Sequence, residues 1–415
     1  MARVPRVVAG RLRIRRAEAA FAGAAARAGL SLAGDDADLV VAHDTLFARL
    51  AASGWIGLAE GYFAGEWATP DSTHLVAVLE RLIAAKYAPR TPRLAPASGG
   101  IGVEIPASLV PHFSGDDVSP FQGHFATGVP TTQRVAVKSW VPGAGKRGAP
   151  ATHFVDRTEV GPPLDTSRLD LGDAQARTVA SLLDAAGVGE GTHVLIAPAA
   201  GGAVATAGAL RGATVDCIAP SDNARALREH LTYVGVGDSV HVVEAPEPNQ
   251  PVGCGSSYDA VVSVEHLETL APADSRRFLR SVDAVLAPGG RVALQTIVRT
   301  DALSPAARAT VESMRAYVWP GLSFSTPGEL AKLVDRHTRL RIVAESHAPQ
   351  HLAESLRLQR ITFEGNARDA AADGYDVVYR RLWLWQLALR EALARLGMLD
   401  LVQLRLATRS RGGRR

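Results

Sequence analysis

Two glutamates and a histidine follow directly on a strongly apolar run. Residues 258–264 predict a buried strand, and Glu265, His266 and Glu268 lie immediately behind it. A carboxylate in an apolar environment can orient a small oxyanion through a shared proton or a hydrogen bond, which is acid–base chemistry. Alternatively, Glu268 caps the helix that is expected next. Both roles are open to Glu268.

The elements around this segment alternate between strand and helix from residue 173 onward. Repeated βα units of this length imply a parallel sheet that is covered on both faces and binds ligands at the carboxyl ends of its strands. The predicted fold class is therefore α/β, with a doubly wound, mostly parallel, Rossmann-like sheet. The expected strands are residues 193–197, 214–218, 240–243, 258–264 and 290–298.

Two regions of different character precede this α/β part. Residues 1–87 combine helical patterns with one short strand pattern and predict a small α+β domain. Residues 88–165 are crowded with Pro, Gly, Ser and Thr and predict a linker or a loop-rich surface. The main domain is expected over residues 166–415.

Composition limits the kind of protein. The 415 residues are 47% hydrophobic, enough for one large domain and a smaller one, each with its own core. The two cysteines, Cys217 and Cys254, lie far apart and have no metal-ligand spacing around them, which disfavours a disulfide framework and a zinc site. No apolar run is long enough to span a membrane, and no signal peptide is evident. We therefore expect a cytoplasmic protein that is at most peripherally bound to the inner face of the membrane.

Arginines gather at both ends of the chain, although the net charge is only +3. Such ends suit an anionic surface, either a lipid or a nucleic acid, and they also suit a simple solvated terminus. No aromatic residues are interleaved with the arginines, as binding to a single strand would require. Nucleic acid is therefore not expected as a partner.

Several segments resemble one protein family. The turn Ala287-Pro288-Gly289-Gly290 before the last strand resembles that of class I S-adenosylmethionine-dependent methyltransferases, and residues 263–268 resemble the signature of cyclopropane-fatty-acid synthases. Outside this domain, residues 57–67, the turn at 319–321 and residues 355–403 agree with the same family. The chain is thus identified as a divergent member of the cyclopropane-fatty-acyl-phospholipid synthase family. The resemblance implies a seven-stranded sheet and a helical acyl-chain lid at about residues 305–396.

The resemblance also implies a mechanism and its residues. In that family an acyl double bond attacks the sulfonium methyl group of S-adenosylmethionine, and the resulting carbocation loses a proton. Bicarbonate is the implied acceptor, held in part by the residues that correspond to Glu268 and His351. The residues implied to bind the acyl chain are Gln295, Trp319 and Trp383.

The Trp383 assignment has an alternative. Trp383 belongs to an aromatic run on a helix expected at residues 374–396, where Tyr379, Leu382 and Gln386 share its face. Side chains on one face of a helix must pack against something, so burial in a core is the favoured interpretation. Both roles are compatible if this helix lines an acyl tunnel.

The cofactor loop departs from the family's pattern. Glycines in the family's loop let the backbone approach the methionine part of the cofactor. Here Pro198 and Ala200 stand at two glycine positions, and Ile196 replaces the expected acidic residue. The alternative for this loop is a helix N-terminus that packs under a strand. The residues implied to bind the cofactor are Ala197, Ala199, Gly201, Gly202 and Ser221.

Other contacts of the family are altered as well. Ala224 replaces a glutamine, and the acid expected beside the adenine has only Glu247 as a shifted candidate. Residues 111–117 are the nearest match to a segment that holds cofactor and acyl chain, but Phe113 lacks the tyrosine hydroxyl, as Leu352 does beside His351.

Two functions follow from these observations. The first is S-adenosylmethionine-dependent transfer of a one-carbon unit to unsaturated acyl chains of phospholipids, at a membrane surface. The second is a catalytically inactive relative that binds lipid or acts as a scaffold for another lipid-modifying enzyme. A homodimer, or a heteromer with a related enzyme, fits either one.

Overall fold

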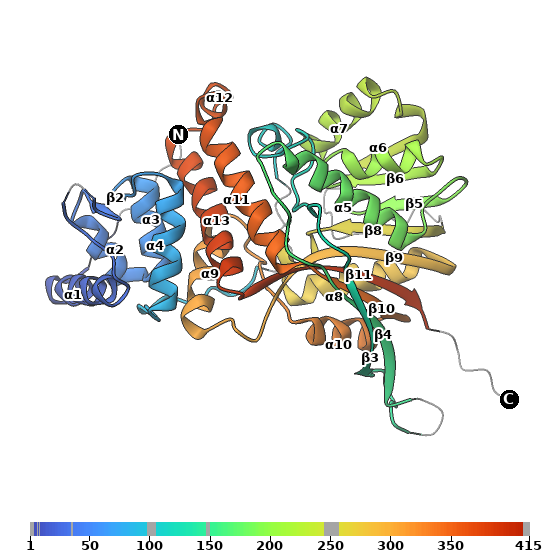
Figure 1. Ribbon diagram of the computed structural model, residues 1–415, viewed down its shortest axis with the longest axis horizontal. Coiled ribbons are helices and arrows are strands. Elements are labelled where there is room, and N and C mark those ends of the chain that lie inside the picture. Colours follow the sequence, from blue (N-terminus) through green and yellow to red (C-terminus); the bar gives the residue numbers. More distant parts are fainter. Residues whose placement is uncertain are drawn as a thin grey trace. The chain divides into compact units, whose positions relative to one another are not determined.

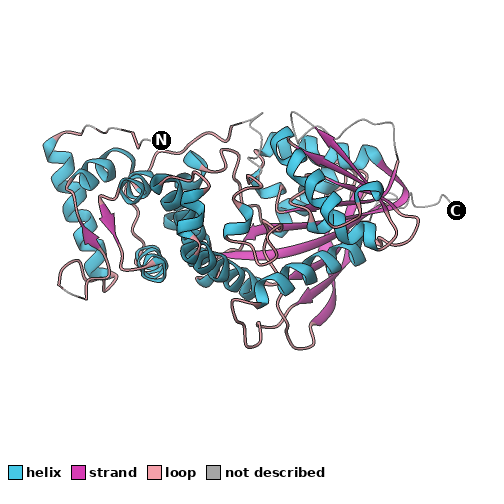
Figure 2. Ribbon diagram, turned by 90° about the horizontal axis from the view of Figure 1, so that it is seen from above, coloured by secondary structure: helices cyan, strands magenta, loops and turns pink. Residues whose placement is uncertain are grey.

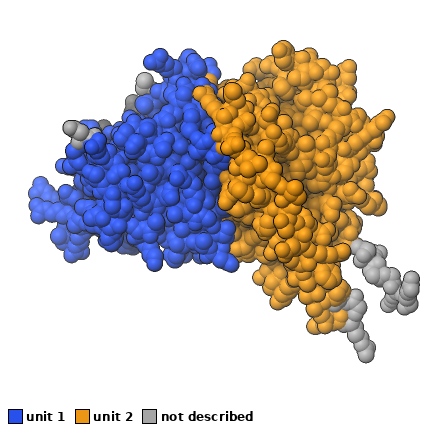
Figure 3. All heavy atoms as spheres, in the orientation of Figure 1, with its two compact units in different colours: residues 1–96, 300–322, 352–399 blue, residues 97–299, 323–351, 400–415 orange. Residues whose placement is uncertain are grey.

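The computed structural model describes residues 4–5, 7, 9–34, 36–97, 105–146, 150–244 and 257–409. The chain divides into two compact units, each of which is built from separate stretches of sequence (Figure 3). Unit 1 comprises residues 1–96, 300–322 and 352–399, and unit 2 comprises residues 97–299, 323–351 and 400–415.

Unit 2 is built on a nine-stranded sheet with the order β3-β4-β10-β11-β9-β8-β5-β6-β7 (Figure 1). The strands β5 to β9 pair in parallel, whereas β3 pairs antiparallel with β4, and β10 pairs antiparallel with β11. This arrangement confirms the α/β class with a mostly parallel sheet. The strands are β3 (Thr131–Lys138), β4 (Thr152–Glu159), β5 (His193–Ile196), β6 (Thr214–Ala219), β7 (Val240–Glu244), β8 (Tyr258–Val264), β9 (Leu286–Arg299), β10 (Leu340–His347) and β11 (Leu399–Thr408).

Helices cover both faces of this sheet (Figures 1 and 2). One core lies between the sheet and α5, α6 and α7, and the other lies between the sheet and α8 and α10. Strand β8 is almost entirely buried, because a central parallel strand with helices on both faces has no solvent side. The helices of unit 2 are α5 (Asp170–Ala186), α6 (Ala203–Leu210), α7 (Ser221–Tyr233), α8 (Pro272–Val285) and α10 (Pro327–His337), with 3-10 turns η1 (Val110–His112), η2 (Gly237–Ser239) and η3 (Leu267–Thr269).

Pairing register brings the ends of three central strands to one edge. Val194 of β5 is level with Val215 of β6 and with Ala260 of β8. Because the three strands are parallel, their carboxyl ends meet at the same edge of the sheet. The loops after β5, β6 and β8 therefore lie close together, and these loops carry most of the candidate site residues.

The region expected to be a linker contributes two strands to this sheet. Strands β3 and β4 form an antiparallel hairpin, and β4 pairs in parallel with β10. Val155 of β4 is buried in the core under α8 and α10, where Val135 and Val137 of β3 also pack. The sheet therefore has nine strands and not the expected seven. The alternating apolar residues of β3 and β4 lie in a region rich in Pro and Gly, so the sequence pattern did not predict these two strands.

Unit 1 is mostly helical. Its centre is a cluster of aromatic side chains around Trp385. The centroid of the Trp385 ring lies 5.9 Å from that of Tyr62, 6.1 Å from that of Phe63 and 6.2 Å from that of Trp67. The indole N–H of Trp385 donates a hydrogen bond to the Ser313 hydroxyl. The elements are α1 (Arg11–Arg27), β1 (Val40–Val41), α2 (Thr45–Ser53), α3 (Trp55–Ala64), β2 (Trp67–Ala68), α4 (Ser72–Ala84), α9 (Pro305–Tyr317), α11 (Pro349–Gly365, which begins in unit 2), α12 (Ala367–Ala372) and α13 (Val377–Arg395).

The division of the chain differs from the one expected from the sequence. Helices α9 and α13 were expected in the methyltransferase-like domain, yet they belong to unit 1 with the N-terminal helices. The physical reason is the aromatic cluster around Trp385, which joins α13 to α3. Such long-range packing is invisible to a division that follows sequence order.

The N-terminal signature at residues 57–67 serves the packing of unit 1. Arg49 is buried and donates from Nε to both carboxylate oxygens of Glu66 at 2.9 Å, while its Nη1 lies 3.2 Å from Glu60. A β-carbon on Gly57 would stand 2.2 Å from the carbonyl oxygen of Arg49. The signature therefore brings α2 and α3 into close contact around a buried ion cluster.

Candidate functional site

The loop after β5 is hydrogen-bonded to both neighbouring strands. The amide of Ala197 donates to the carbonyl of Val262 on β8 at 3.1 Å, and the amide of Ala199 donates to the carbonyl of Ile218 on β6 at 2.8 Å. These bonds fix residues 199–202 at the carboxyl ends of β5 and β6, directly before α6. Open parallel sheets bind their ligands at this edge.

Two glycines of the loop make room for other parts of this chain. A β-carbon on Gly201, whose φ is +81°, would stand 1.7 Å from the carbonyl oxygen of Val118. A β-carbon on Gly202 would stand 2.4 Å from the ring of His230 on α7. Both positions therefore exclude a larger residue, because the protein itself fills the direction in which a side chain would extend.

Residues 105–122, here called the covering segment, run over this loop. Their central turn is built around Asp116, whose Oδ1 accepts hydrogen bonds from the amides of Val118 at 3.1 Å and Ser119 at 2.7 Å. The buried amide of Gln175 on α5 adds a second anchor, because it donates to the carbonyls of Ser119 and Phe121. The turn is thus held by Asp116, which belongs to it, and by Gln175 of α5, which bonds to its backbone carbonyls.

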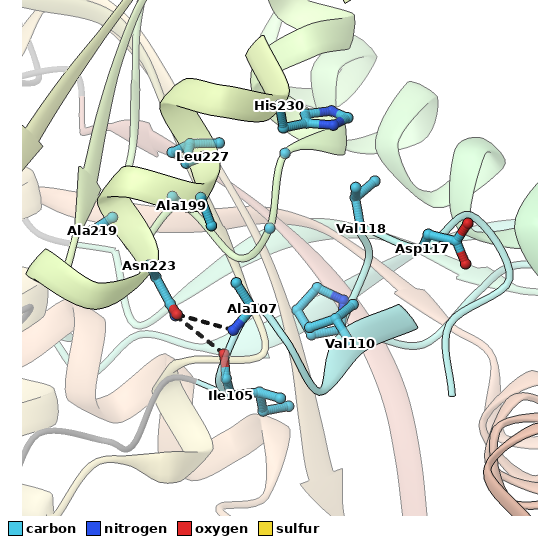
Figure 4. A pocket seen from close by; sticks show the side chains of 14 residues that line it. Ile105, Ala107, Val110, Asp117, Val118, Ala199, Ala219, Asn223, Leu227 and His230 are labelled. Atoms are coloured by element: carbon cyan, nitrogen blue, oxygen red, sulfur yellow. Dashed lines mark hydrogen bonds between the residues drawn. The ribbon is translucent and has the colours of Figure 1, made fainter. Parts of the chain in front are cut away.

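Asn223 holds the start of the covering segment. Its Oδ1 accepts from the amide of Ala107 at 3.0 Å, and its Nδ2 donates to the carbonyl of Ile105 at 3.1 Å (Figure 4). Both ends of one side-chain amide are therefore bound to the same stretch of backbone. This clamp fixes residues 105–107 against α7 at the side of a pocket.

The pocket lies between the loop after β5, helix α7 and the covering segment (Figure 4). The space in the pocket and at its open mouth is about 680 Å³. Most of its lining is apolar. The lining residues are Ile105, Ala107, Val110, Asp117, Val118, Pro120, Ala199, Gly201, Gly202, Ala219, Asn223, Ala226, Leu227 and His230.

Two carboxyl groups follow β8 in unit 2. Glu268 is fully buried, and its oxygens accept from the Thr296 hydroxyl at 2.7 Å and from the Ile297 amide at 3.1 Å. Burial, and then the charge of Glu265, raise the pKa of Glu268 to about 8. Glu268 is therefore protonated at neutral pH, which distinguishes it from an ordinary surface carboxylate.

Glu265 is held by a cage of amides. Its Oε1 accepts from the backbone amide of Gln122 at 2.7 Å and from Nε2 of Gln295 at 3.0 Å. Gln295 in turn accepts from Nε2 of Gln403, whose own Oε1 accepts from the Ser181 hydroxyl. Glu265 has a φ of +48°, which is unusual for a residue other than glycine and occurs where the surrounding structure enforces it.

Both ring nitrogens of His351 lie within hydrogen-bonding distance of backbone groups. Its Nδ1 accepts from the backbone amide of Phe125 at 2.9 Å, and its Nε2 lies 2.8 Å from the carbonyl oxygen of Gly161. The neighbouring ring of His124 lies 5.8 Å away, and burial lowers the pKa of His124 to about 4. His351 therefore joins two backbone segments of unit 2.

Comparison with known proteins assigns the chain to a family. The sequence model of the family described as mycolic acid cyclopropane synthetase matches residues 164–404, which is more than half of the chain. The chain belongs to the mycolic acid cyclopropane synthetase family. It is therefore a methyltransferase-family protein of the kind that acts on lipids, and the family resemblance seen in its motifs is confirmed.

Individual relatives agree with this assignment. The tuberculostearic acid methyltransferase UfaA1 of Mycobacterium tuberculosis is 28% identical over 380 residues, covering 87% of this chain and 80% of the relative. The cyclopropane synthase MmaA2 of the same organism aligns with a TM-score of 0.53 at 18% identity, over 59% of this chain and 87% of MmaA2. Coclaurine N-methyltransferase, solved with N-methylheliamine and SAH, aligns with a TM-score of 0.54 at 12% identity, over 86% of this chain and 96% of its own. The two solved structures establish the fold.

The resemblance to cyclopropane-fatty-acyl-phospholipid synthases implied five cofactor residues, and three of them line the pocket. Ala199, Gly201 and Gly202 line it. Ala197 and Ser221 are not among its described lining residues: Ala197 is buried beside β8, and Ser221 is exposed at the start of α7. The candidate adenine acid Glu247 lies outside the described residues.

The residues implied to bind the acyl chain lie in different units. Gln295 belongs to unit 2 and is buried in the amide cage of Glu265. Trp319 and Trp383 belong to unit 1, where both are buried, and the guanidinium of Arg390 lies 5.1 Å from the Trp319 ring. Trp383 thus has the buried position that the core interpretation expected.

Four residues of the pocket and the amide cage were missed as site residues by the sequence reasoning. Asn223 and His230 lie seven residues apart on α7 and therefore face the same side of the helix. Helical spacing in the sequence could have predicted that these two side chains lie on one face. Glu265 lies within residues 263–268, the segment that resembles the family signature, but it was assigned no role. Gln122 carried no signal, because its part in the cage comes from backbone folding in the covering segment.

No helix among the described residues is both long and apolar enough to cross a membrane.

Proposed function

We propose that this protein transfers a one-carbon unit from S-adenosylmethionine to an unsaturated fatty-acyl chain of a phospholipid. The observation that carries the proposal is the pocket at the carboxyl ends of β5 and β6, which lies where the fold binds ligands and is bordered by the covering segment. Family membership and the similarity to a tuberculostearic acid methyltransferase support a lipid acyl chain as the acceptor.

The pocket suits the adenosyl part of the cofactor. Ala199, Ala219 and Leu227 offer apolar surfaces against which a purine can pack. The amides at the start of α6 can hold an anionic or polar group. S-adenosylmethionine, when bound, supplies an electrophilic methyl group. These residues would bind and orient it and exclude water from the sulfonium.

The acid pair suits the second part of the reaction. Methylation of a carbon–carbon double bond leaves a positive charge on the acyl chain, and the product forms when a proton is lost. Bicarbonate, when bound, supplies an acceptor for that proton. Glu268 is protonated below about pH 8 and can share its proton with a small oxyanion. Glu265, caged by amides, keeps a fixed position beside it.

We also propose that the acyl chain is presented at a membrane surface, because a phospholipid acceptor resides in a bilayer. The protein then works as a peripheral enzyme.

The test is an acyl-methylation assay with the full chain. The protein is incubated with S-adenosylmethionine carrying a labelled methyl group, with bicarbonate and with vesicles of dioleoyl phospholipid, and the fatty acids are analysed by mass spectrometry. We expect a mass gain of one carbon unit on the oleoyl chain. Label absent from the lipid, under conditions in which a known cyclopropane synthase transfers it, would contradict the proposal.

Substitution tests the role of Glu268 in the same assay. Glu268→Gln is expected to abolish transfer, since an amide cannot exchange a proton with an oxyanion. Glu190→Gln, at an exposed position, serves as the matched control and is expected to keep full activity. Equal activity of the two variants would remove Glu268 from the mechanism.

A further inference from the structure

Positively charged side chains surround one tryptophan ring at the edge of the sheet in unit 2. The amino group of Lys138, the last residue of the edge strand β3, lies 4.1 Å from the centroid of the Trp140 ring. From α10, the amino group of Lys332 lies 5.2 Å and Cζ of Arg336 lies 5.8 Å from the same centroid. Two elements far apart in the sequence therefore bring three positive charges to one place on the surface.

The positive charge continues along α10 and onto α8. These two helices pack against each other on one face of the sheet (Figure 1). Burial, and then the charges of three arginines, lower the pKa of His337 at the end of α10. The arginines are Arg280 and Arg276 of α8 and Arg336 of α10. The surface called here the cationic face consists of the exposed side chains of Lys138, Arg276, Arg280, Lys332 and Arg336.

Carboxylates close to the cationic face do not neutralise it. Three of them are paired with other arginines, in the pairs Arg341–Asp335, Arg339–Asp283 and Arg134–Asp156. Within the described part of the chain, no ion pair joins a carboxylate to Lys138, Lys332 or Arg336. Like charges that are held close together repel each other, and an anionic partner relieves that repulsion.

The position of Trp140 is fixed by its backbone. Its amide donates a hydrogen bond of 2.7 Å to Oδ2 of Asp335, a buried carboxylate of α10. Single-stranded nucleic acid binds by stacking its bases on open aromatic faces, whereas cations lie over this ring. An indole beside cations is instead typical of the boundary between water and a lipid bilayer.

A second aromatic side chain lies on the outer face of the same hairpin. Phe154 of β4 is 61% exposed and is level with Ala136 of β3, two residues before Lys138. Residues two apart on a strand share a face, so Phe154 and Lys138 point to the same side. The guanidinium of Arg134 lies 5.3 Å from the Phe154 ring. Apolar rings that are flanked by cations suit the headgroup region, where the rings enter the bilayer and Lys and Arg reach the phosphates.

We propose that the cationic face, together with Trp140 and Phe154, docks this protein on a bilayer of anionic phospholipid. The proposal rests on the proposed function, because it assigns a surface of unit 2 to the contact with the membrane that holds the acceptor. Its basis is charge complementarity: five exposed basic side chains face the phosphates, and two aromatic rings lie among them.

The first experiment measures binding of the full chain to vesicles by flotation. One set of vesicles contains dioleoyl phosphatidylcholine alone, and the other contains an equimolar mixture with dioleoyl phosphatidylglycerol. We expect at least about tenfold tighter binding to the anionic vesicles, because each basic residue near such a surface strengthens binding about fivefold. The preference should disappear when salt shortens the Debye length to about 3 Å. Equal binding to both sets at low salt overturns the proposal.

Charge reversal locates the contact. The double variant Lys332→Glu/Arg336→Glu should bind anionic vesicles about 25-fold or more weakly, since each residue contributes about fivefold. Arg177→Glu/Arg225→Glu is the matched control, because it changes the net charge equally at exposed positions of α5 and α7, which cover the other face of the sheet. Equal losses in the two double variants would assign the effect to net charge and overturn the proposal.

Phe154→Ser tests insertion into the bilayer. The side chain is mostly exposed, so the substitution should leave the circular dichroism spectrum unchanged. Binding to anionic vesicles should weaken about tenfold, because the ring no longer leaves water. Leu169→Ser, at an 89% exposed position directly before α5, is the matched apolar control and should bind like the wild-type protein. Wild-type affinity of Phe154→Ser overturns the placement of this ring in the bilayer.

A detergent assay separates this proposal from the proposed function. In mixed micelles of detergent and dioleoyl phospholipid no bilayer has to be bound, so Lys332→Glu/Arg336→Glu should transfer the labelled methyl group at the wild-type rate. Wild-type protein that prefers anionic vesicles but transfers no label in either system contradicts the proposed function and leaves the docking surface standing. Wild-type protein that transfers label without preferring anionic vesicles contradicts the docking surface alone.

A single-stranded oligonucleotide serves as the competing polyanion. We expect it to leave the protein on anionic vesicles when it is added at the same concentration of phosphate. Release from the vesicles, together with oligonucleotide binding that is lost in Lys332→Glu/Arg336→Glu, would make the cationic face a nucleic-acid surface and overturn the proposal.

Discussion

The hydroxyl of Thr296 donates a hydrogen bond of 2.7 Å to Oε2 of Glu268, inside a part of unit 2 from which water is excluded. This bond opposes the effect of burial, because it stabilises the ionised carboxylate and lowers its pKa. The ionisation of Glu268 is therefore set by burial and the charge of Glu265, which raise its pKa, and by the hydrogen bonds from Thr296 and the backbone, which lower it.

Removal of that hydroxyl should raise the pKa of Glu268 further above about 8. In Thr296→Val, methyl transfer should therefore persist to higher pH than in the wild-type protein, because the protonated form of Glu268 is retained. The pH profile of the acyl-methylation rate is the measurement. Thr296→Ser keeps the hydroxyl and should keep the wild-type profile; an identical profile in all three proteins would contradict the assignment.

Glu268 should also make stability depend on pH. Its pKa is raised on folding from about 4.5 to about 8, so between these values the folded state binds more protons than the unfolded state and stability falls as the pH rises. Glu268→Gln removes this dependence. In urea unfolding, the variant should gain stability relative to the wild-type protein between pH 5 and pH 8. A constant difference over this range would show that Glu268 titrates normally.

His347 should make stability fall with rising pH as well, over a higher pH range. Burial lowers its pKa, but the carboxylates of Asp400, at 2.7 Å, and Glu345, at 3.1 Å, outweigh burial and raise the pKa to about 9. The raised pKa contributes about 3 kcal/mol to stability below pH 6.5, and this contribution is lost as the pH rises through 9. His347→Gln should therefore be destabilised at pH 6 and nearly neutral at pH 10, as measured by denaturant unfolding. Equal destabilisation at both pH values would argue against a charged His347.

Arg49 supports unit 1 through its buried ion cluster. Arg49→Met leaves the carboxylates of Glu60 and Glu66 buried without their partner, which costs about 3–5 kcal/mol. The free energy of unfolding measures this cost. Arg225→Met, on the exposed face of α7, is the matched control and should change stability by less than about 0.5 kcal/mol. A small effect of both substitutions would mean that water reaches the cluster.

Gln295 should affect catalysis more than cofactor binding. Gln295→Leu removes the donor to Glu265 and the acceptor for Gln403, so the Glu265 carboxylate loses its fixed position. We expect kcat to fall about tenfold or more while the dissociation constant of S-adenosylhomocysteine stays within about twofold. Because Gln295 lies outside the described pocket lining, a large loss of cofactor affinity would contradict this role.

The sequence by itself determined the class of fold and the family. Apolar runs of strand length that alternate with helical patterns predict a parallel sheet, since both of its faces must be covered. Short motifs, such as residues 263–268 and the turn at 287–290, carried the family resemblance. The family resemblance also pointed to Ala199, Gly201 and Gly202, which line the pocket.

Tertiary structure alone decided how those elements are used. The hairpin β3–β4 joined the sheet because its valines share a core with α8 and α10, which lie more than a hundred residues away in the sequence. The role of Gly201 came from the Val118 carbonyl, and the pKa of Glu268 came from burial and from Glu265 and Thr296. Each of these depends on contacts between distant residues, and a one-dimensional pattern does not contain such contacts.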